Sequence, residues 1–151
     1  MTHSELVERG AKWLAKNSNP CYRSPVVLTE FRSYAKEIPD VIGMNHNHST
    51  VIECKTSLSD FKADLRKSHR NHPESLGNWR FYLCPDGVIP ASLVPGDWGL
   101  LYCNPHRISI RKTPYIHYEP EIRKEEYHLL YSIARRVVIR GLMEQVLMPL
   151  R

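Results

Sequence analysis

Two acidic residues and a lysine stand at the ends of two short apolar segments of this chain. Asp40 follows a proline and leads into an apolar run, and Glu53 and Lys55 close the next apolar run. Carboxylate oxygens are ligands that hard divalent cations prefer, and an ammonium group can offset negative charge on a phosphate. If these three side chains converge, they could hold a Mg²⁺ or Mn²⁺ ion and a water molecule beside a phosphodiester.

The spacing of the second segment suits that chemistry. Side chains of a strand alternate between its two faces, so Glu53 and Lys55 share one face while Cys54 points to the other. We expect Glu53 to reach the metal and Lys55 to reach the water or the scissile phosphate. Cys54 would anchor the opposite face in the core, and its backbone carbonyl could add a neutral metal ligand. A hairpin through the Asn/His loop at 45–49 would lay Asp40 beside Glu53, completing a catalytic and metal-binding set.

Glu30 is a candidate for a further metal ligand. It shares a face with Leu28 in a run rich in β-forming residues, where a carboxylate is costly to bury unless it is paired or bound to a metal. The alternative is a solvated strand end, and the sequence leaves both open. Glu5 or Glu8 in the first helical segment could also approach the site.

The elements that must position these residues follow from periodicity and turn residues. Six strands are predicted, over residues 26–31, 39–44, 50–55, 78–84, 99–103 and 107–111. Three helices are predicted, over residues 5–16 after a Ser4 cap, 60–69 after a Ser59 cap, and 121–148. The order αβββαβ at the start predicts an α/β fold, a mixed sheet covered by helices.

The bulk composition is that of an ordinary globular chain. With 151 residues, 42% hydrophobic and 25% charged, one domain over residues 1–151 is expected. There is no apolar run of about 18 residues and no secretory signal, which predicts a cytoplasmic protein without a membrane partner. The four cysteines are widely spaced, which favours reduced thiols. The net charge of +5 suits a polyanionic partner.

Basic residues gather just after the candidate site: Lys62, Arg66, Lys67, His69 and Arg70. Three of them recur at four-residue steps, which puts them on one face of a helix. Phosphate contact with a nucleic acid would make binding depend on salt. The alternative is a solvated face whose charge is balanced by Asp60 and Asp64.

Two other features leave alternatives open. His46 and His48 could bind a transition metal, or could simply fill a loop. The apolar residues of the segment 121–148 could form a homodimer interface or could dock on the sheet of their own chain. Gly141 within that segment permits close packing or a bend.

The segments around Asp40 and Glu53 read Pro39-Asp40 and Glu53-Cys54-Lys55, which resembles the Pro-Asp…Glu-x-Lys signature of the PD-(D/E)XK nucleases. The continuation from Glu53 to Lys67 resembles the MmcB-like branch, which is associated with DNA repair. There a Glu-x-Lys strand runs into a Ser/Arg-x-Asp-Phe-x-x-Asp-x-x-Lys helix. The likeness covers about residues 26–102; Ile38-Pro39 and the long stretch 71–77 depart from the pattern.

The resemblance implies a restriction-endonuclease-like fold and a Mg²⁺- or Mn²⁺-dependent deoxyribonuclease working in DNA repair, recombination or defence. Its implied active-site set is Glu30, Asp40, Glu53 and Lys55, with Asp64 and Lys67 lining the site from the helix. Two rival hypotheses remain: a DNA-binding or scaffold protein that kept the nuclease fold without catalysis, and a basic interaction protein in which the motif is accidental.

Overall fold

A six-stranded sheet forms the centre of the computed structural model, which describes residues 1–67, 75–118 and 120–150. The strands follow the chain order and are β1 Val26–Thr29, β2 Val41–Met44, β3 Ser49–Cys54, β4 Trp79–Pro85, β5 Gly99–Cys103 and β6 Ile108–Lys112. β3 and β5 pair with β4 in parallel, whereas the other neighbours are antiparallel. The mixed sheet confirms the predicted α/β fold.

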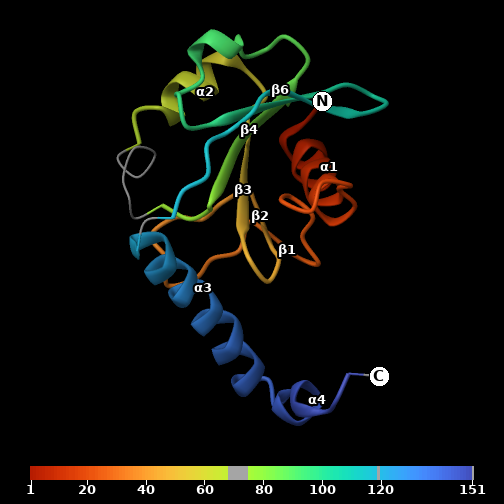
Figure 1. Cartoon of the computed structure of the whole chain (residues 1–151), viewed down its shortest axis with the longest axis vertical. Helices are drawn as coiled ribbons and strands as arrows, with labels where there is room; N and C mark the ends of the chain where they lie inside the picture. Colours follow the sequence, from red (N-terminus) through yellow and green to blue (C-terminus); the bar gives the residue numbers. More distant parts are fainter. Residues whose placement is uncertain (68–74, 119, 151) are drawn as a thin grey trace.

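Helices cover both faces of this sheet (Figure 1). The helices are α1 His3–Ala15, α2 Leu58–Asp64, the short 3₁₀ helix η2 Ala91–Leu93, α3 Pro120–Ile139 and α4 Met143–Leu147, of which α4 lies away from the sheet. In Figure 1, α1 lies on one side of the strands and α2 on the other. The beginning of the chain therefore has the predicted order αβββαβ.

Alternating side chains of β4 show how the two layers are held. Phe81 and Leu83 are fully buried in the cluster that includes Leu6 and Leu14 of α1. Tyr82 points the other way and is fully buried with Phe61 of α2 and Trp98. Because successive strand residues face opposite sides, one strand contributes to both cores.

The cap of α1 differs from the prediction. Thr2, and not Ser4, accepts a 3.2 Å hydrogen bond from the backbone N–H of Glu5, and the N–H of Thr2 donates to the Glu5 carboxylate at 2.6 Å. This reciprocal capping box satisfies two helix-end N–H groups, whereas a Ser4 cap would satisfy one. α1 therefore begins earlier, with His3 in its first turn.

α2 also begins earlier than predicted. Its cap is Ser57, whose hydroxyl accepts from the N–H of Asp60 at 3.2 Å, and not Ser59. The helix ends at Asp64, so the predicted span of 60–69 is wrong at its start and at its end. Residues 68–70 lie outside the described residues.

The predicted helix over 121–148 is two helices. Gly141 has a φ of 68°, a left-handed conformation that ends α3 and turns the chain into α4. Ile122 and Leu129 near the start of α3 are fully buried, so this end docks on the body of the protein. The far end of α3 and α4 project away from the sheet (Figure 1).

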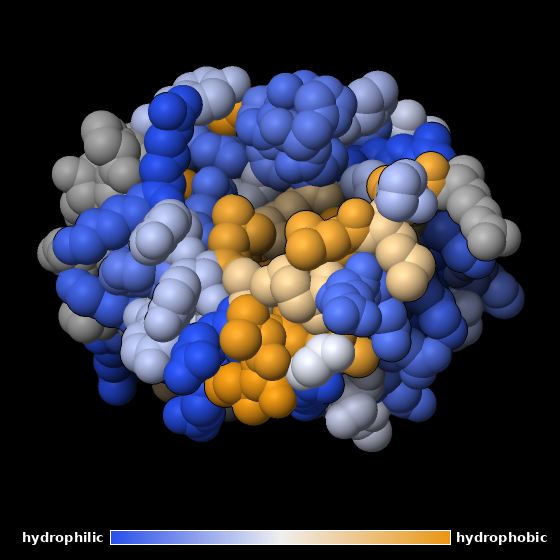
Figure 2. Space-filling model, turned by 90° about the horizontal axis from the view of Figure 1, so that it is seen from below, coloured by the Kyte–Doolittle hydropathy of each residue, from blue (hydrophilic) through white to orange (hydrophobic). Residues whose placement is uncertain are grey.

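The projecting end carries a hydrophobic surface. Seen from below, apolar side chains gather at the centre of the face (Figure 2). The exposed apolar residues from the end of α3 onward are Val138, Ile139, Leu142, Met143, Val146, Leu147, Met148 and Leu150. Among the residues that the structure describes, no helix has both the length and the hydropathy needed to cross a membrane.

Candidate active site

The strand register places three acidic residues at one level of the sheet. In the β2–β3 pair Val41 lies opposite Ile52, so Asp40, one position before, lies opposite Glu53, one position after. On the other side of β2, the backbone N–H of Glu30 donates to the carbonyl of Asp40 at 3.0 Å. The β2–β3 hairpin therefore brings Asp40 beside Glu53, as the sequence predicted.

A cavity of about 510 Å³ opens over this row. The residues that line it are His3, Lys36, Ile38, Asp40, Glu53, Cys54, Lys55, Asp60 and Lys67. All three predicted catalytic residues line the same cavity. Sequence reasoning missed His3 and Lys36, because nothing in their local pattern indicates that α1 and the segment before β2 reach this point.

One carboxylate oxygen of Asp40 is held by the backbone, and the other faces His3. Its Oδ2 accepts a 2.7 Å hydrogen bond from the backbone N–H of Cys54, which ties the start of β2 to the end of β3. Its Oδ1 lies 3.4 Å from His3 Nε2. A carboxylate that is fixed in this way loses little conformational freedom on binding a cation, and preorganised groups of this kind bind more strongly.

Lys55 lies between two buried carboxylates. Its Nζ is 3.7 Å from Glu53 Oε2 and donates to Asp64 Oδ1 at 3.1 Å, and the three residues are 5%, 3% and 1% exposed respectively. Burial by itself lowers the pKa of Lys55, but the charges of Glu53 and Asp64 outweigh it, so the pKa is raised. The position and the charge of the Lys55 ammonium group are therefore both held by its buried carboxylate partners.

Asp64 is the residue that holds Lys55 in place. The hydroxyl of Tyr82 donates to Asp64 Oδ2 at 3.0 Å, and Lys67 Nζ lies 2.9 Å from Asp64 Oδ1. The resemblance implied Asp64 and Lys67 as residues lining the site. The contribution of Tyr82 was missed, because its hydroxyl reaches Asp64 only through the parallel pairing of β3 and β4.

Cys54 occupies the position expected of it. Its side chain is fully buried in the cluster beneath α1, on the face of the sheet opposite Glu53 and Lys55. Burial raises the pKa of its thiol, with a further contribution from the charge of Asp40. The thiol is therefore a core side chain, which leaves only the backbone of Cys54 for the site.

The burial argument for Glu30 is wrong. β1 ends at Thr29, Glu30 has a φ of 47°, and its side chain is 63% exposed. The left-handed backbone turns its side chain out of the strand alternation, so Glu30 does not share a buried face with Leu28. Its Oε1 lies 3.6 Å from His3 Nε2, which keeps it near Asp40 at the edge of the site.

The basic residues do not form the predicted helical face. Lys62 is on α2, but Arg66 and Lys67 follow the end of the helix, and all three are exposed. Lys67 is engaged by Asp64 at 2.9 Å. Arg70 lies outside the described residues. The prediction of a single helical face repeating every four residues is therefore wrong, although Lys36, Lys55 and Lys67 line the cavity.

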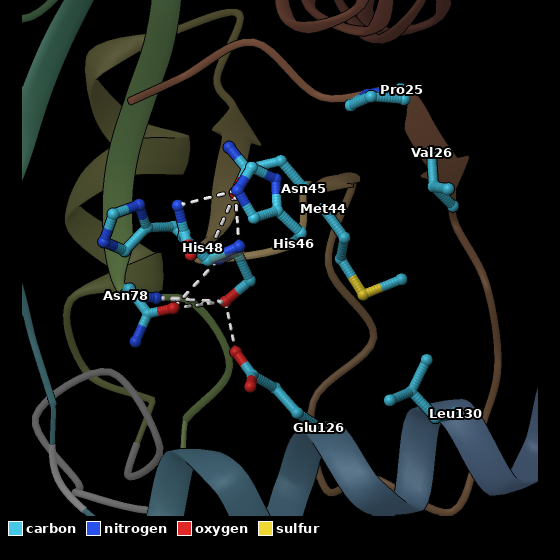
Figure 3. Close-up of a pocket in the computed structure, with 11 residues that line it drawn as sticks. Pro25, Val26, Met44, Asn45, His46, His48, Asn78, Glu126 and Leu130 are labelled. Carbon is cyan, nitrogen blue, oxygen red and sulfur yellow. Dashed lines mark hydrogen bonds between the residues drawn. The ribbon is translucent and has the colours of Figure 1, made fainter. Parts of the chain in front are cut away.

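The loop with His46 and His48 lies over a separate hollow (Figure 3). The His46 ring is 3.1 Å from Asn47 Nδ2, and His48 Nε2 is 3.3 Å from the Tyr118 hydroxyl. Within the described part of the chain, neither histidine belongs to a group of three metal-ligating side chains. In the same hollow, Ser49 hydrogen-bonds to Glu126 and so fastens α3 to β3.

Comparisons with known proteins support the fold and no more. No family model and no curated protein matches the chain. Among solved structures, the chain is similar to SPO1766, a protein of unknown function from Silicibacter pomeroyi. The TM-score is 0.64 at 22% sequence identity, and the match covers 99% of this chain and 97% of that one. The arrangement of helices and sheet is thus found in another protein.

Proposed function

We propose that this protein is a metal-dependent nuclease that hydrolyses phosphodiester bonds of DNA. The observation that carries the proposal is the convergence of Asp40, Glu53 and Lys55 on one cavity, with Lys55 held as an ammonium ion beside two carboxylates. Two acidic oxygens and one fixed cation are the groups that a phosphodiesterase needs in order to hold a divalent ion and to offset charge on the phosphate.

The donor set fits Mg²⁺ or Mn²⁺. Asp40 and Glu53 would supply carboxylate oxygens and Cys54 a backbone carbonyl, which are hard ligands of the kind these ions take. The bound ion would polarise a phosphate oxygen and lower the pKa of a water molecule. Asp40 suits this role because its other oxygen is already fixed by the N–H of Cys54.

Lys55 acts on the substrate as a positive charge. Its pKa is raised, so it carries a proton throughout the neutral range and would stabilise the negative charge that develops on the phosphate. Asp64 is a positioning residue, because it contacts Lys55 and is buried at the end of α2, outside the residues that line the cavity.

DNA is the substrate class that the surroundings favour. Lys36 and Lys67 line the cavity, and Lys62 and Arg66, which are near Lys67 in the chain, are exposed. Contacts between such groups and backbone phosphates release counterions, so they give affinity without sequence preference. The net charge of +5 acts in the same direction.

Purified protein incubated with plasmid or branched DNA and Mg²⁺ tests the proposal. We expect cleavage that a chelator abolishes and that Asp40→Asn and Lys55→Ala each reduce by at least about 100-fold, as loss of one transition-state contact does. Lys12→Ala is the matched control, because Lys12 is an exposed lysine that pairs with Glu8 on α1.

Two outcomes would overturn the proposal. Cleavage that persists equally in both variants would show that the nicking activity arises elsewhere. Salt-sensitive binding without cleavage, indifferent to a chelator, would favour a DNA-binding or scaffold protein that kept the fold.

A further inference from the structure

His3 brings an imidazole to a site otherwise built from oxygen ligands. Its Nε2 lies 3.4 Å from Asp40 Oδ1 and 3.6 Å from Glu30 Oε1. These three ligand atoms all lie within 4.8 Å of one another. Glu53 does not belong to this group, so the group is offset from the Asp40–Glu53 pair toward α1 and β1.

The separations of His3 from the two carboxylates, 3.4 and 3.6 Å, can be compared with those between ligands of one ion. A direct hydrogen bond to a carboxylate oxygen is typically about 2.7 to 3.2 Å, shorter than either distance. Two ligands bound to one metal at about 2.1 Å lie about 3.0 Å apart in octahedral and about 3.4 Å apart in tetrahedral geometry. The spacing of His3 from both carboxylates is close to these ligand-to-ligand values.

Three separate elements fix these donors. The capping box of Thr2 and Glu5 sets the first turn of α1, and buried Leu6 holds that helix against the sheet. Glu30 is turned toward the site by the left-handed backbone that ends β1, and Asp40 is fixed by the N–H of Cys54. The group is therefore a product of tertiary structure and not of neighbouring residues in the sequence.

We propose that His3, Glu30 and Asp40 form a second cation position that prefers a transition-metal ion such as Mn²⁺ over Mg²⁺. Imidazole nitrogen is a good ligand for transition metals, whereas Mg²⁺ is served almost entirely by oxygen. Two carboxylates with a neutral imidazole match the charge of a divalent ion. Binding of this ion does not depend on the nuclease hypothesis. A role for the ion in cleavage does rest on that hypothesis, in which Asp40 would be a ligand at both cation positions.

Pulsed electron paramagnetic resonance of Mn²⁺ bound to the full chain, without DNA, tests this directly. The protein is prepared without a histidine tag and without any extension before Met1. We expect modulation from an imidazole nitrogen in the wild-type protein, its loss in His3→Gln, and its retention in His46→Gln. His46 is the matched control because it is an exposed histidine in a loop away from the cavity. Calorimetry should show one Mn²⁺ equivalent fewer in His3→Gln.

Absence of nitrogen modulation in the wild-type protein, or modulation that persists in His3→Gln, would overturn the inference. Its failure is distinct from failure of the nuclease proposal. Protein that cleaves DNA with Mg²⁺ but shows no imidazole coupling contradicts only the second cation position. Protein that shows the coupling but does not cleave DNA contradicts only the nuclease activity.

Discussion

Lys55 donates a 3.1 Å hydrogen bond to one oxygen of Asp64, and the other oxygen of that carboxylate accepts from Tyr82 at 3.0 Å. The lysine that follows β3 is thereby fixed by Asp64 of α2, which is itself held by Tyr82 of β4. A charged side chain that is almost fully buried needs such partners, because an unpaired buried charge is strongly destabilising. The position of the ammonium group is therefore set by the fold before any substrate binds.

Replacing Asp64 by asparagine should weaken both stability and cleavage. The amide keeps the shape of the carboxylate but removes its charge, which leaves Lys55 with Glu53 alone. Loss of one partner of a buried pair costs about 3 kcal/mol in the free energy of unfolding, the lower end of the usual range. Loss of a positioning partner reduces activity by about 10- to 100-fold. Urea unfolding and DNA cleavage measure the two effects.

Asp86→Asn is the control for that substitution, because Asp86 is an exposed residue in the turn after β4. It should change the free energy of unfolding by less than about 0.5 kcal/mol. Equal effects of the two substitutions would contradict the role given to Asp64.

The stability difference between the wild-type protein and Asp64→Asn should depend on pH in one direction. In the folded state the pKa of Lys55 is raised above its ordinary value of 10.5, so folding favours the protonated form. The raised pKa of Lys55 contributes fully to the free energy of unfolding at pH values below the pKa that Lys55 has in the unfolded chain. That contribution is lost as the pH rises through the pKa that Lys55 has in the folded protein. The difference should stay constant from about pH 6 to 9 and shrink above about pH 10.5. Unfolding curves across that range check it; a change near pH 7 would contradict it.

The sequence predicted the strands well because their signals are local. β5 lies over the predicted residues, and the others differ from prediction by one or two residues at one or both ends. Alternation also predicted that Cys54 lies in the core while Glu53 and Lys55 share the other face, since that depends only on the pleat of one strand. The helix caps were less accurate, because Thr2 and Ser4, and likewise Ser57 and Ser59, are all good capping residues two positions apart.

The site was predicted only where it depends on neighbouring strands of one hairpin. Asp40 and Glu53 meet because the loop between β2 and β3 is short. His3 comes from a helix that reaches the site through packing, and no local pattern shows this. The burial of Glu30 was predicted wrongly for a related reason. The β-forming residues continue to Phe31, but the strand ends at Thr29 and the backbone of Glu30 is left-handed, which the residue pattern does not indicate.

Thiol reactivity should separate Cys21 from the other cysteines. Cys21 is exposed, whereas Cys54, Cys84 and Cys103 are buried. Burial raises the pKa of Cys84 to about 11 and also raises the pKa of Cys54 and Cys103, so few thiolates form there. Native protein at pH 8 should take up one equivalent of a thiol reagent by mass spectrometry, and unfolded protein should take up four. Rapid uptake of more than one by folded protein would contradict this arrangement.

Because the segments over β2 pack closely against it, a methyl group added at Gly43 should destabilise the protein. A Cβ added at Gly43 would lie 2.4 Å from Ser24 Oγ and 2.9 Å from Leu14 Cδ1. Gly43→Ala should lower the free energy of unfolding by about 1 to 3 kcal/mol, as overpacking does. Gly96→Ala is the control, because a Cβ there meets no atom within 4 Å. Denaturant unfolding compares the two; equal stability would show that α1 can shift without cost.

The apolar end of the chain predicts self-association. Val146 and Leu147 of α4 are 60% and 73% exposed, and apolar side chains gather on the face seen in Figure 2. Patches of this kind on soluble proteins mark interfaces, and in a pure preparation a second copy of the chain is the available partner. Light scattering should give the mass of a dimer for the wild-type protein. Val146→Glu with Leu147→Glu should give the mass of a monomer, since charges on this surface would have to be buried. The thermal unfolding of the sheet should be unaffected, because α4 makes no buried contact with it. A wild-type monomer would instead show that the apolar surface of α4 stays exposed in solution.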